Sequence, residues 1–269
     1  PVWGEYTVHE GKRVHPLVKA QCFNFCPCCL IGCSDRSSQR AWRNFLVSWS
    51  FTTGMVQIAL MVLSTVLFGG FVSMEKNPML GPHYHALDLM GAKNAVRILE
   101  KGEWYRLFCP MFLHGGWFHL IGNLLVQLRV GVMLEVMWGS SIWILIFVPS
   151  GLYSSLASCI YSPEHLGIGS SGALCGLLGA WLTFNLITWN QTLPMDVRER
   201  NMQTLNVGTS VLLIIGLSFL PLMDAAAHFG GLAMGIALAM VVFASRLQHQ
   251  YWRIGTRICG YVLLLALVP

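Results

Sequence analysis

The chain is organised as long apolar stretches separated by shorter polar segments. A membrane-spanning helix needs about 20 mostly apolar residues. Stretches of this kind lie at 46–70, 117–138, 141–161, 171–189, 206–222 and 226–244, and a seventh begins near residue 256. Only 14 residues remain from there to the end, so we expect the seventh helix to be partial or truncated. The pattern predicts an all-α polytopic membrane protein with six core helices and a partial seventh.

Composition and charge agree with a membrane protein. Of the 269 residues, 55% are apolar and only 11% are charged, whereas soluble domains have about 45–50% and about 25%. Residues 1–43 and 72–113 together hold 18 of the 29 charged residues. These numbers argue against a soluble globular enzyme, a disordered chain or a nucleic-acid binder. The expected surroundings are the lipid bilayer, with no nucleic-acid partner.

Lysine and arginine indicate the orientation, because they are concentrated in the cytosolic loops of membrane proteins. With the N-terminus in the cytosol, the cytosolic segments hold 11 of the 17 lysines and arginines, and the loop at 72–113 holds five. This bias predicts a cytosolic N-terminus in a protein of the endomembrane system or plasma membrane. The sequence has one N-x-[ST] sequon, at Asn190. The predicted topology places it in the cytosol, so we expect no glycan there.

Three segments follow from this pattern. Residues 1–45 are predicted to be a cytosolic segment, 46–245 the six-helix membrane domain, and 246–269 a linker with the truncated seventh helix. The first loop of the membrane domain, 72–113, mixes charged and apolar residues, which is typical of a segment that lies in the membrane interface. Within this loop, 92–101 is predicted to form a short helix.

Five cysteines are clustered about a dozen residues before the first span. They are Cys22, Cys26, Cys28, Cys29 and Cys33. Disulfides are disfavoured in the cytosol, and thiols close to a membrane are typical of S-palmitoylation. A zinc site and unmodified thiols remain the alternatives, although the spacing matches no common C-x2-C pair arrangement. We predict acylation, with no metal and no cofactor in the protein.

Four polar residues lie inside spans, where each is costly and needs a reason. His119 and Asn123 are four residues apart on one face of the second span, Ser171 begins the fourth, and His228 lies one turn into the sixth. In the predicted topology all four lie in the exoplasmic half of the membrane. Polar groups at similar depth on three helices can converge on one cavity.

Small residues below Ser171 and His228 support this convergence. Gly172 and Gly176 form one small-xxx-small pair, and Gly231 and Gly235 form another on the His228 face. Such pairs allow helix backbones to approach closely. If the two faces meet, they bring the serine and the histidine within reach of each other.

A serine beside a neutral imidazole is a nucleophile with its general base. Asp224 precedes His228 by four residues, but we expect it in the preceding loop, so the residues predict a Ser171–His228 dyad. The oxyanion of the intermediate needs hydrogen-bond donors. The Ser171 N–H at a helix N-terminus and the Asn123 and His119 side chains could supply them.

Four sequence blocks resemble the rhomboid intramembrane serine proteases. They are G-S-S-G-A-L-C-G-L-L-G from Gly169, A-H-F-G-G-L-A-M-G from Ala227, H-G-G-W-F-H-L-I-G-N from His114, and E-W-Y-R from Glu103. Together they extend over about 100–245. The order of the blocks matches that of the family, and the resemblance implies the six-helix rhomboid core.

The resemblance also assigns roles. Ser171 would be the nucleophile and His228 the base, with Asn123, His119 and Gly169 supporting the oxyanion. Residues with implied structural roles are Arg106 in the first loop, His114, Glu135, Gly172, Gly176, Gly231 and Gly235. The implied substrates are single-pass membrane proteins, cut within or beside their spanning helix. The helix after the core resembles the eukaryotic secretase-type layout of six helices plus one.

The chain also departs from the family pattern. Cys175 stands where the family has an aromatic residue against the catalytic histidine, Tyr105 replaces a tryptophan, and Met137 replaces a basic partner for Glu135. Two other functions therefore stay open. One is a catalytically weak rhomboid-like protein that binds membrane clients without cutting them. The other, a channel or small transporter, is disfavoured because no inverted repeat is visible.

Overall fold

The computed structural model confirms the predicted all-α polytopic membrane fold. It describes residues 7–9, 12–14, 43–189, 197–220 and 223–268. The predictions for the cysteine cluster and for Asn190 concern residues outside these ranges. A short antiparallel hairpin, β1 (Thr7–His9) with β2 (Lys12–Val14), precedes the helices, with Thr7 opposite Val14.

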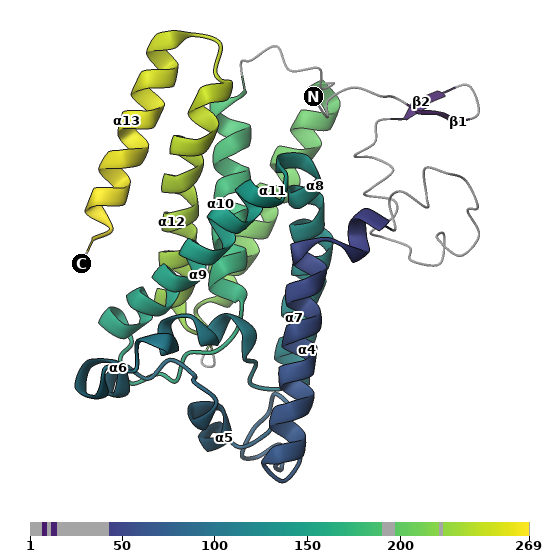
Figure 1. Cartoon of the computed structure of the whole chain (residues 1–269). Helices are drawn as coiled ribbons and strands as arrows, with labels where there is room; N and C mark the ends of the chain where they lie inside the picture. Colours follow the sequence, from purple (N-terminus) through teal and green to yellow (C-terminus); the bar gives the residue numbers. More distant parts are fainter. Residues whose placement is uncertain (1–6, 10–11, 15–42, 190–196, 221–222, 269) are drawn as a thin grey trace.

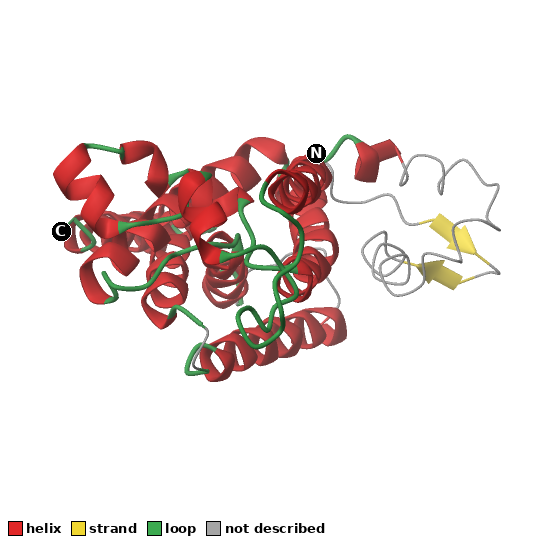
Figure 2. Cartoon of the chain, turned by 90° about the horizontal axis from the view of Figure 1, so that it is seen from below, coloured by secondary structure: helices red, strands yellow, loops and turns green. Residues whose placement is uncertain are grey.

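Eight α-helices make up the bundle in the part of the chain that the structure describes. They are α4 (Trp49–Leu67), α7 (Trp117–Val126), α8 (Val132–Trp138), α9 (Ser140–Tyr161), α10 (Ser171–Ile187), α11 (Val197–Leu217), α12 (Ala225–Phe243) and α13 (Gln250–Ala266). The first loop carries α5 (Tyr84–Leu89), α6 (Ala95–Lys101) and the 3-10 helices η1 (Trp104–Leu107) and η2 (Cys109–Phe112). Figure 1 shows α5 and α6 together at one end of the bundle, and Figure 2 views the bundle from that end.

Among the described residues, four helical segments are long and apolar enough to cross a membrane. They are Trp49–Leu67, Trp117–Trp138, Ser140–Tyr161 and Ala225–Arg246, and the last includes the 3-10 turn η4 (Ala244–Arg246). Helix α10 is apolar but has only 17 residues. Each of these segments starts within three residues of a predicted span.

Two helices begin earlier than the apolar pattern predicts. Helix α11 starts at Val197 instead of 206, and α13 starts at Gln250 instead of 256. Both extensions are polar or amphipathic stretches that contain arginine. Hydropathy locates the part of a helix that lies in lipid, whereas the hydrogen-bonded helix continues into the interface wherever the residues are compatible with it. The seventh helix is therefore longer than expected, with 17 residues.

The second span is continuous but not uniformly α-helical. A π-helical turn, η3 (Gln127–Gly131), separates α7 from α8. The buried Gln127 side chain donates to the Ser50 carbonyl and the Thr53 hydroxyl on α4, both at 3.0 Å, and accepts from Gln57 at 3.2 Å. The wider turn lies where this amide network fixes α7 against α4.

Glu135 stabilises the start of α4. Its carboxylate accepts the backbone N–H groups of Trp49 at 2.9 Å and Ser50 at 3.0 Å, and the Ser140 hydroxyl at 2.7 Å. A negative charge is favourable at a helix N-terminus, where N–H groups have no intrahelical partner. Met137 stands where a basic partner was expected, and the Glu135 carboxylate instead accepts hydrogen bonds from the N-terminus of α4.

Helix α10 occupies the centre and packs against α9, α11 and α12. The two glycine pairs meet as expected. A methyl group on Gly231 would overlap the Gly172 carbonyl oxygen, and one on Gly235 would overlap the Gly176 carbonyl oxygen. The α10 and α12 backbones are therefore in direct contact below the two residues that the sequence singled out.

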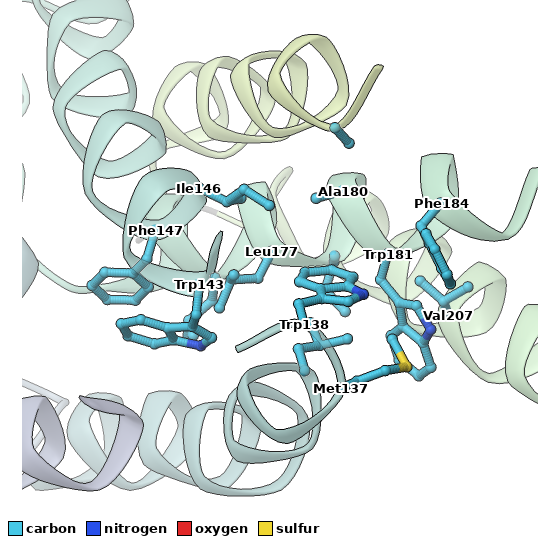
Figure 3. Close-up of a cluster of buried hydrophobic side chains, with 14 of the residues drawn as sticks. Met137, Trp138, Trp143, Ile146, Phe147, Leu177, Ala180, Trp181, Phe184 and Val207 are labelled. Atoms are coloured by element: carbon cyan, nitrogen blue, oxygen red, sulfur yellow. The ribbon is translucent and has the colours of Figure 1, made fainter. Parts of the chain in front are cut away.

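Aromatic side chains fill the core toward the C-terminal end of α10, away from Ser171 (Figure 3). Trp138 lies with its ring centroid 5.0 Å from that of Phe243, and Phe184 is also 5.0 Å from Phe243. Trp143 and Phe147 stack at 4.4 Å. This packing holds the ends of α8, α10 and α12 together, away from the polar end of the bundle.

The first loop is built around Arg106, which is buried. Its Nη1 donates to the Asp88 carbonyl at 2.7 Å and the Ala92 carbonyl at 2.9 Å, and its Nε donates to Glu103 at 2.5 Å. The hydrogen bond from Arg106 lowers the pKa of Glu103. Apolar side chains of the same loop stay exposed, including Leu99 at 74% and Trp104 at 61%, which suits a segment lying in the membrane interface.

Candidate active site

Ser171 is the first residue of α10, and the residues before it shape the approach. Gly169 has a φ of 107°, a left-handed conformation that glycine adopts without a steric clash. Its N–H donates to the Pro110 carbonyl at 2.9 Å. Gly167 pairs with Lys93 of the first loop through two backbone hydrogen bonds of 2.9 and 3.1 Å. The segment before the serine is thus held by the first loop on both sides of Ile168.

His228 lies one turn into α12 and faces Ser171. Its Nε2 is 2.9 Å from the Ser171 Oγ. Asp224 caps this helix by accepting the Ala227 N–H at 3.0 Å, and its second carboxylate oxygen accepts the Ser158 hydroxyl. Asp224 is therefore the N-cap of the helix that carries the histidine, in agreement with its expected place before the span.

The other nitrogen of the imidazole has a partner that the sequence analysis missed. Ser218, after the last residue of α11, places its Oγ 2.7 Å from His228 Nδ1. Ser218 is 2% exposed. One signal was available in the sequence: the fifth span ends on the same side of the membrane as the sixth begins, so Ser218 and His228 share a depth.

The candidate oxyanion residues lie close together beside the segment that precedes Ser171. The Asn123 amide donates to the His119 carbonyl at 3.0 Å, which fixes that side chain against its own helix. A β-carbon on Gly169 would lie 2.7 Å from the His119 ring and 3.7 Å from the Asn123 amide nitrogen. Gly169, His119 and Asn123 are thus direct neighbours. Because Gly169 has no side chain, it leaves space for the imidazole of His119.

One cavity of about 350 Å³ lies beside these groups, and Asn123 is not among the residues that line it. Ser171, His228, His119 and Gly169 all line it. The remaining lining mixes apolar residues with polar ones, which include Lys93, Ser154, Ser158, His165 and Asp224. Such a cavity is large enough to admit water and part of a peptide to the serine.

Lys93 is fully buried beside this cavity. Its ammonium donates to the Ser162 carbonyl at 2.9 Å and the Ser158 carbonyl at 3.4 Å, at the C-terminus of α9. Burial lowers the pKa of Lys93, and the negative charge of Asp224 opposes that effect. The lysine caps the carbonyl end of α9 and anchors the first loop against the site.

His114 lies behind His119 rather than in the cavity. It is 2% exposed, and the two rings contact edge to face with centroids 5.2 Å apart. Burial, together with the neighbouring imidazole, lowers the pKa of His114 to about 3, so the ring is neutral at physiological pH. Its position suits the structural role expected from the sequence.

Comparison with known proteins adds independent information. Residues 101–245, just over half of the chain, match the family model described as Rhomboid domain. Three similar proteins illustrate the range of relatives. "RHOMBOID-like protein 1" of Arabidopsis thaliana is 35% identical over 71% of this chain and 48% of its own length.

Two further relatives carry the word protease in their names. "Rhomboid-like protease 2" of Toxoplasma gondii is 28% identical over 78% of this chain and 71% of its own length. "Rhomboid protease GluP" of Bacillus subtilis is 34% identical over 63% of this chain and 31% of its own length. The chain spans about half the length of the plant relatives it matches.

Proposed function

Because the chain belongs to the rhomboid family, we propose that it is an intramembrane serine endopeptidase. The observation that carries this proposal is the Ser171 Oγ at 2.9 Å from His228 Nε2, with both residues lining the cavity of about 350 Å³. The names of the Toxoplasma and Bacillus relatives support the same class of reaction. The substrates are single-pass membrane proteins, cleaved within or next to their transmembrane helix.

The first half of the reaction forms an acyl-enzyme. Ser171 Oγ attacks the scissile carbonyl while its proton passes to His228 Nε2. The Ser171 N–H belongs to the first turn of α10, whose N–H groups have no intrahelical partner, and it donates to the oxyanion with the Asn123 amide and the His119 ring. The tetrahedral intermediate then collapses as the imidazolium returns the proton to the leaving amine.

The second half releases the acyl group. Water from the cavity attacks the ester carbonyl, and His228 Nε2 takes its proton. The same donors hold the second oxyanion. The Ser171 Oγ then leaves and recovers a proton from the imidazolium, which restores the starting state with no cofactor. The polar residues in the cavity lining support this step, because they can hydrogen-bond water close to the serine.

The substrate segment must leave the helical state before it can react. A transmembrane helix satisfies its carbonyls internally, and its scissile bond is hidden by side chains of adjacent turns. Substrates with small or helix-breaking residues near the cut expose backbone at the lowest cost. The polar groups around Ser171 give that backbone hydrogen-bonding partners in place of those it loses.

Orientation and modification complete the proposal. A cytosolic N-terminus places Ser171 in the exoplasmic half of the membrane, in the endomembrane system or plasma membrane. The cysteine cluster of the N-terminal segment is acylated and anchors that segment to the cytosolic leaflet. Hydroxylamine-sensitive label in an acyl-exchange assay is the expected result, and unlabelled protein would contradict the acylation.

The test compares wild type with Ser171→Ala, using a model single-pass substrate in cells at equal expression. We expect cleavage to be lost with Ser171→Ala and kept with Ser210→Ala, a matched change on α11. Ser210 donates its hydroxyl to the Asn206 carbonyl and lies outside the cavity lining. Cleavage that persists without the Ser171 hydroxyl would overturn the assignment of the nucleophile.

One observation favours the client-binding alternative. Cys175, which is buried, occupies the position of the expected aromatic residue near His228, and a small gap of about 10 Å³ is lined by both residues. A wild-type protein that binds substrates but neither cuts them nor reacts with a fluorophosphonate probe would support this alternative. Cys175→Tyr would then be the variant to test for recovered reactivity.

A further inference from the structure

The hydrogen bonds of Ser218 determine the direction of the contact with His228. The Ser218 Oγ is 2.6 Å from the Ile214 carbonyl oxygen and 2.7 Å from His228 Nδ1. Two oxygens at 2.6 Å need a proton between them, and the hydroxyl has only one to give. The hydroxyl therefore donates to Ile214, and its oxygen accepts a hydrogen bond from Nδ1–H.

This direction has a consequence at the other nitrogen. A neutral imidazole carries one proton, so Nδ1–H leaves a lone pair on Nε2. That lone pair faces the Ser171 hydroxyl at 2.9 Å. The four groups form one directional chain, from Ser171 through His228 and Ser218 to the Ile214 carbonyl. The opposite tautomer would place a proton on Nε2, where the base has to accept one.

We propose that Ser218 is a positioning residue of the active site, which holds His228 in the tautomer and orientation that make Nε2 the base. The inference rests on the proposed protease function and adds a third side chain to the Ser171–His228 pair. When Ser171 gives up its proton, Nδ1 keeps its own, and the imidazolium remains hydrogen-bonded to the Ser218 oxygen.

The surroundings explain why a polar contact is needed here. The gap of about 10 Å³ is lined by Cys175, Ser218 and His228 together with apolar residues of α10, α11 and α12. A thiol fills less space against the imidazole than an aromatic ring does, so packing restrains the ring weakly at this position. The Ser218 hydrogen bond restrains it from the α11 side.

Ser218→Ala removes the acceptor and leaves the backbone intact. The Ser218 N–H bonds the Ile214 carbonyl at 2.9 Å, and this contact does not depend on the side chain. Ser210→Ala is the matched control on the same helix, because Ser210 makes the same bond to a carbonyl four residues back and has no imidazole partner. Ser218→Thr keeps the hydroxyl and can make the same back-bond.

The kinetic test measures kcat and KM for a model substrate in detergent or proteoliposomes. We expect Ser218→Ala to lower kcat about 10- to 100-fold with KM nearly unchanged, a part of what a general base contributes. Ser218→Thr should recover most of the loss, and Ser210→Ala should match wild type. A Ser218→Ala enzyme with wild-type kcat would overturn the inference.

A second readout does not depend on cleavage. Nitrogen-15 NMR of histidine-labelled protein distinguishes protonated from unprotonated ring nitrogens, and the His228→Gln variant assigns the His228 signals among the nine histidines. Wild type should show Nδ1 protonated and Nε2 unprotonated, with a mixture of tautomers in Ser218→Ala. Protonated Nε2 in neutral wild type would overturn the inference, whatever the activity.

The two proposals can fail separately. If Ser171→Ala keeps its activity, the protease assignment itself is wrong. If Ser171→Ala is inactive but Ser218→Ala matches wild type in kcat and in its His228 tautomer, the protease assignment stands and the role of Ser218 is refuted.

Discussion

In the proposed mechanism, the Asn123 side chain acts in the transition state and contributes little to substrate binding. Its amide donates to the His119 carbonyl at 3.0 Å, and its nitrogen lies close to Gly169, two residues before Ser171. We predict that Asn123→Ala lowers kcat about 100-fold, the usual effect of losing one oxyanion donor, with KM changed by less than about threefold. Steady-state kinetics against a model substrate would measure this.

Asn206→Ala on α11 is the control, because that side chain is exposed. A raised KM with normal kcat in Asn123→Ala would instead place Asn123 in substrate binding. Equal losses of folded protein and of activity would make its role structural.

At the scale of single residues, the sequence predicted that Ser171 and His228 come together. It did not predict that Ser218 contacts the other nitrogen of His228. The closeness of Ser171 and His228 was predictable, because ionisable and nucleophilic groups rarely lie at the same depth of an apolar bundle without a reason. Ser218 was not, because a serine in a membrane helix usually bonds a carbonyl of the preceding turn. Ser210 and Ser218 both make that bond, and only the approach of α12 gives one of them an imidazole.

We expect the backbone contact between α10 and α12 to determine the distance between Ser171 and His228. A methyl group at Gly231 would overlap the Gly172 carbonyl, one residue after Ser171. We predict that Gly231→Ala forces the helices apart, destabilises the protein by about 1–3 kcal/mol and abolishes most of the cleavage, since the base moves away from the nucleophile. Thermal unfolding and cleavage by the same purified sample would measure both effects.

Gly208→Ala is the matched control, because a β-carbon there meets no atom within 4 Å. It should leave activity unchanged and Tm equal or slightly higher, as alanine is the better helix former. Wild-type cleavage in Gly231→Ala would show that the backbone contact does not set the active-site distance.

Helix packing was predictable from the sequence where it depends on small side chains. It was less predictable where it depends on hydrogen bonds to residues far away in the chain. The glycine pairs meet because only small residues allow such a contact. The π-helical turn at Gln127 is different, since it coincides with hydrogen bonds to α4, about 75 residues earlier in the chain. Nothing in the local hydropathy of the second span distinguishes a π turn from an α turn.

On the scale of the whole molecule, the cavity around Ser171 lies at one end of α10, and the buried aromatic cluster lies at the other. The first loop, the connection from α9 to α10 and the start of α12 meet around the cavity, through the Lys93–Gly167 pairing and the Asp224 cap. The sequence predicted that polar residues of several spans meet, because they lie at a similar depth in the membrane. The cavity itself depends on how three connections fold over one another, and no periodicity of a single segment encodes that.

Because the two ends of the bundle lie on opposite sides of the membrane, the side of one end determines the side of the other. Helix α10 begins with Ser171 at the polar end and runs for 17 residues, about 25 Å, toward the other end. The lysine and arginine bias predicts that the active-site end is exoplasmic and that the Asn190 sequon, which follows α10 in the sequence, is cytosolic. The two ends should therefore differ in their access to the glycosylation machinery.

We predict that wild type carries no glycan at Asn190. A double variant, Pro163→Asn with His165→Thr, creates a new sequon in the exposed connection between α9 and α10 and should gain an endoglycosidase-sensitive mass shift. Asn190→Gln in the same background is the control and should leave that shift unchanged. A glycan on Asn190 with none at position 163 would reverse the predicted topology, and with it the side of the membrane on which the proposed active site lies.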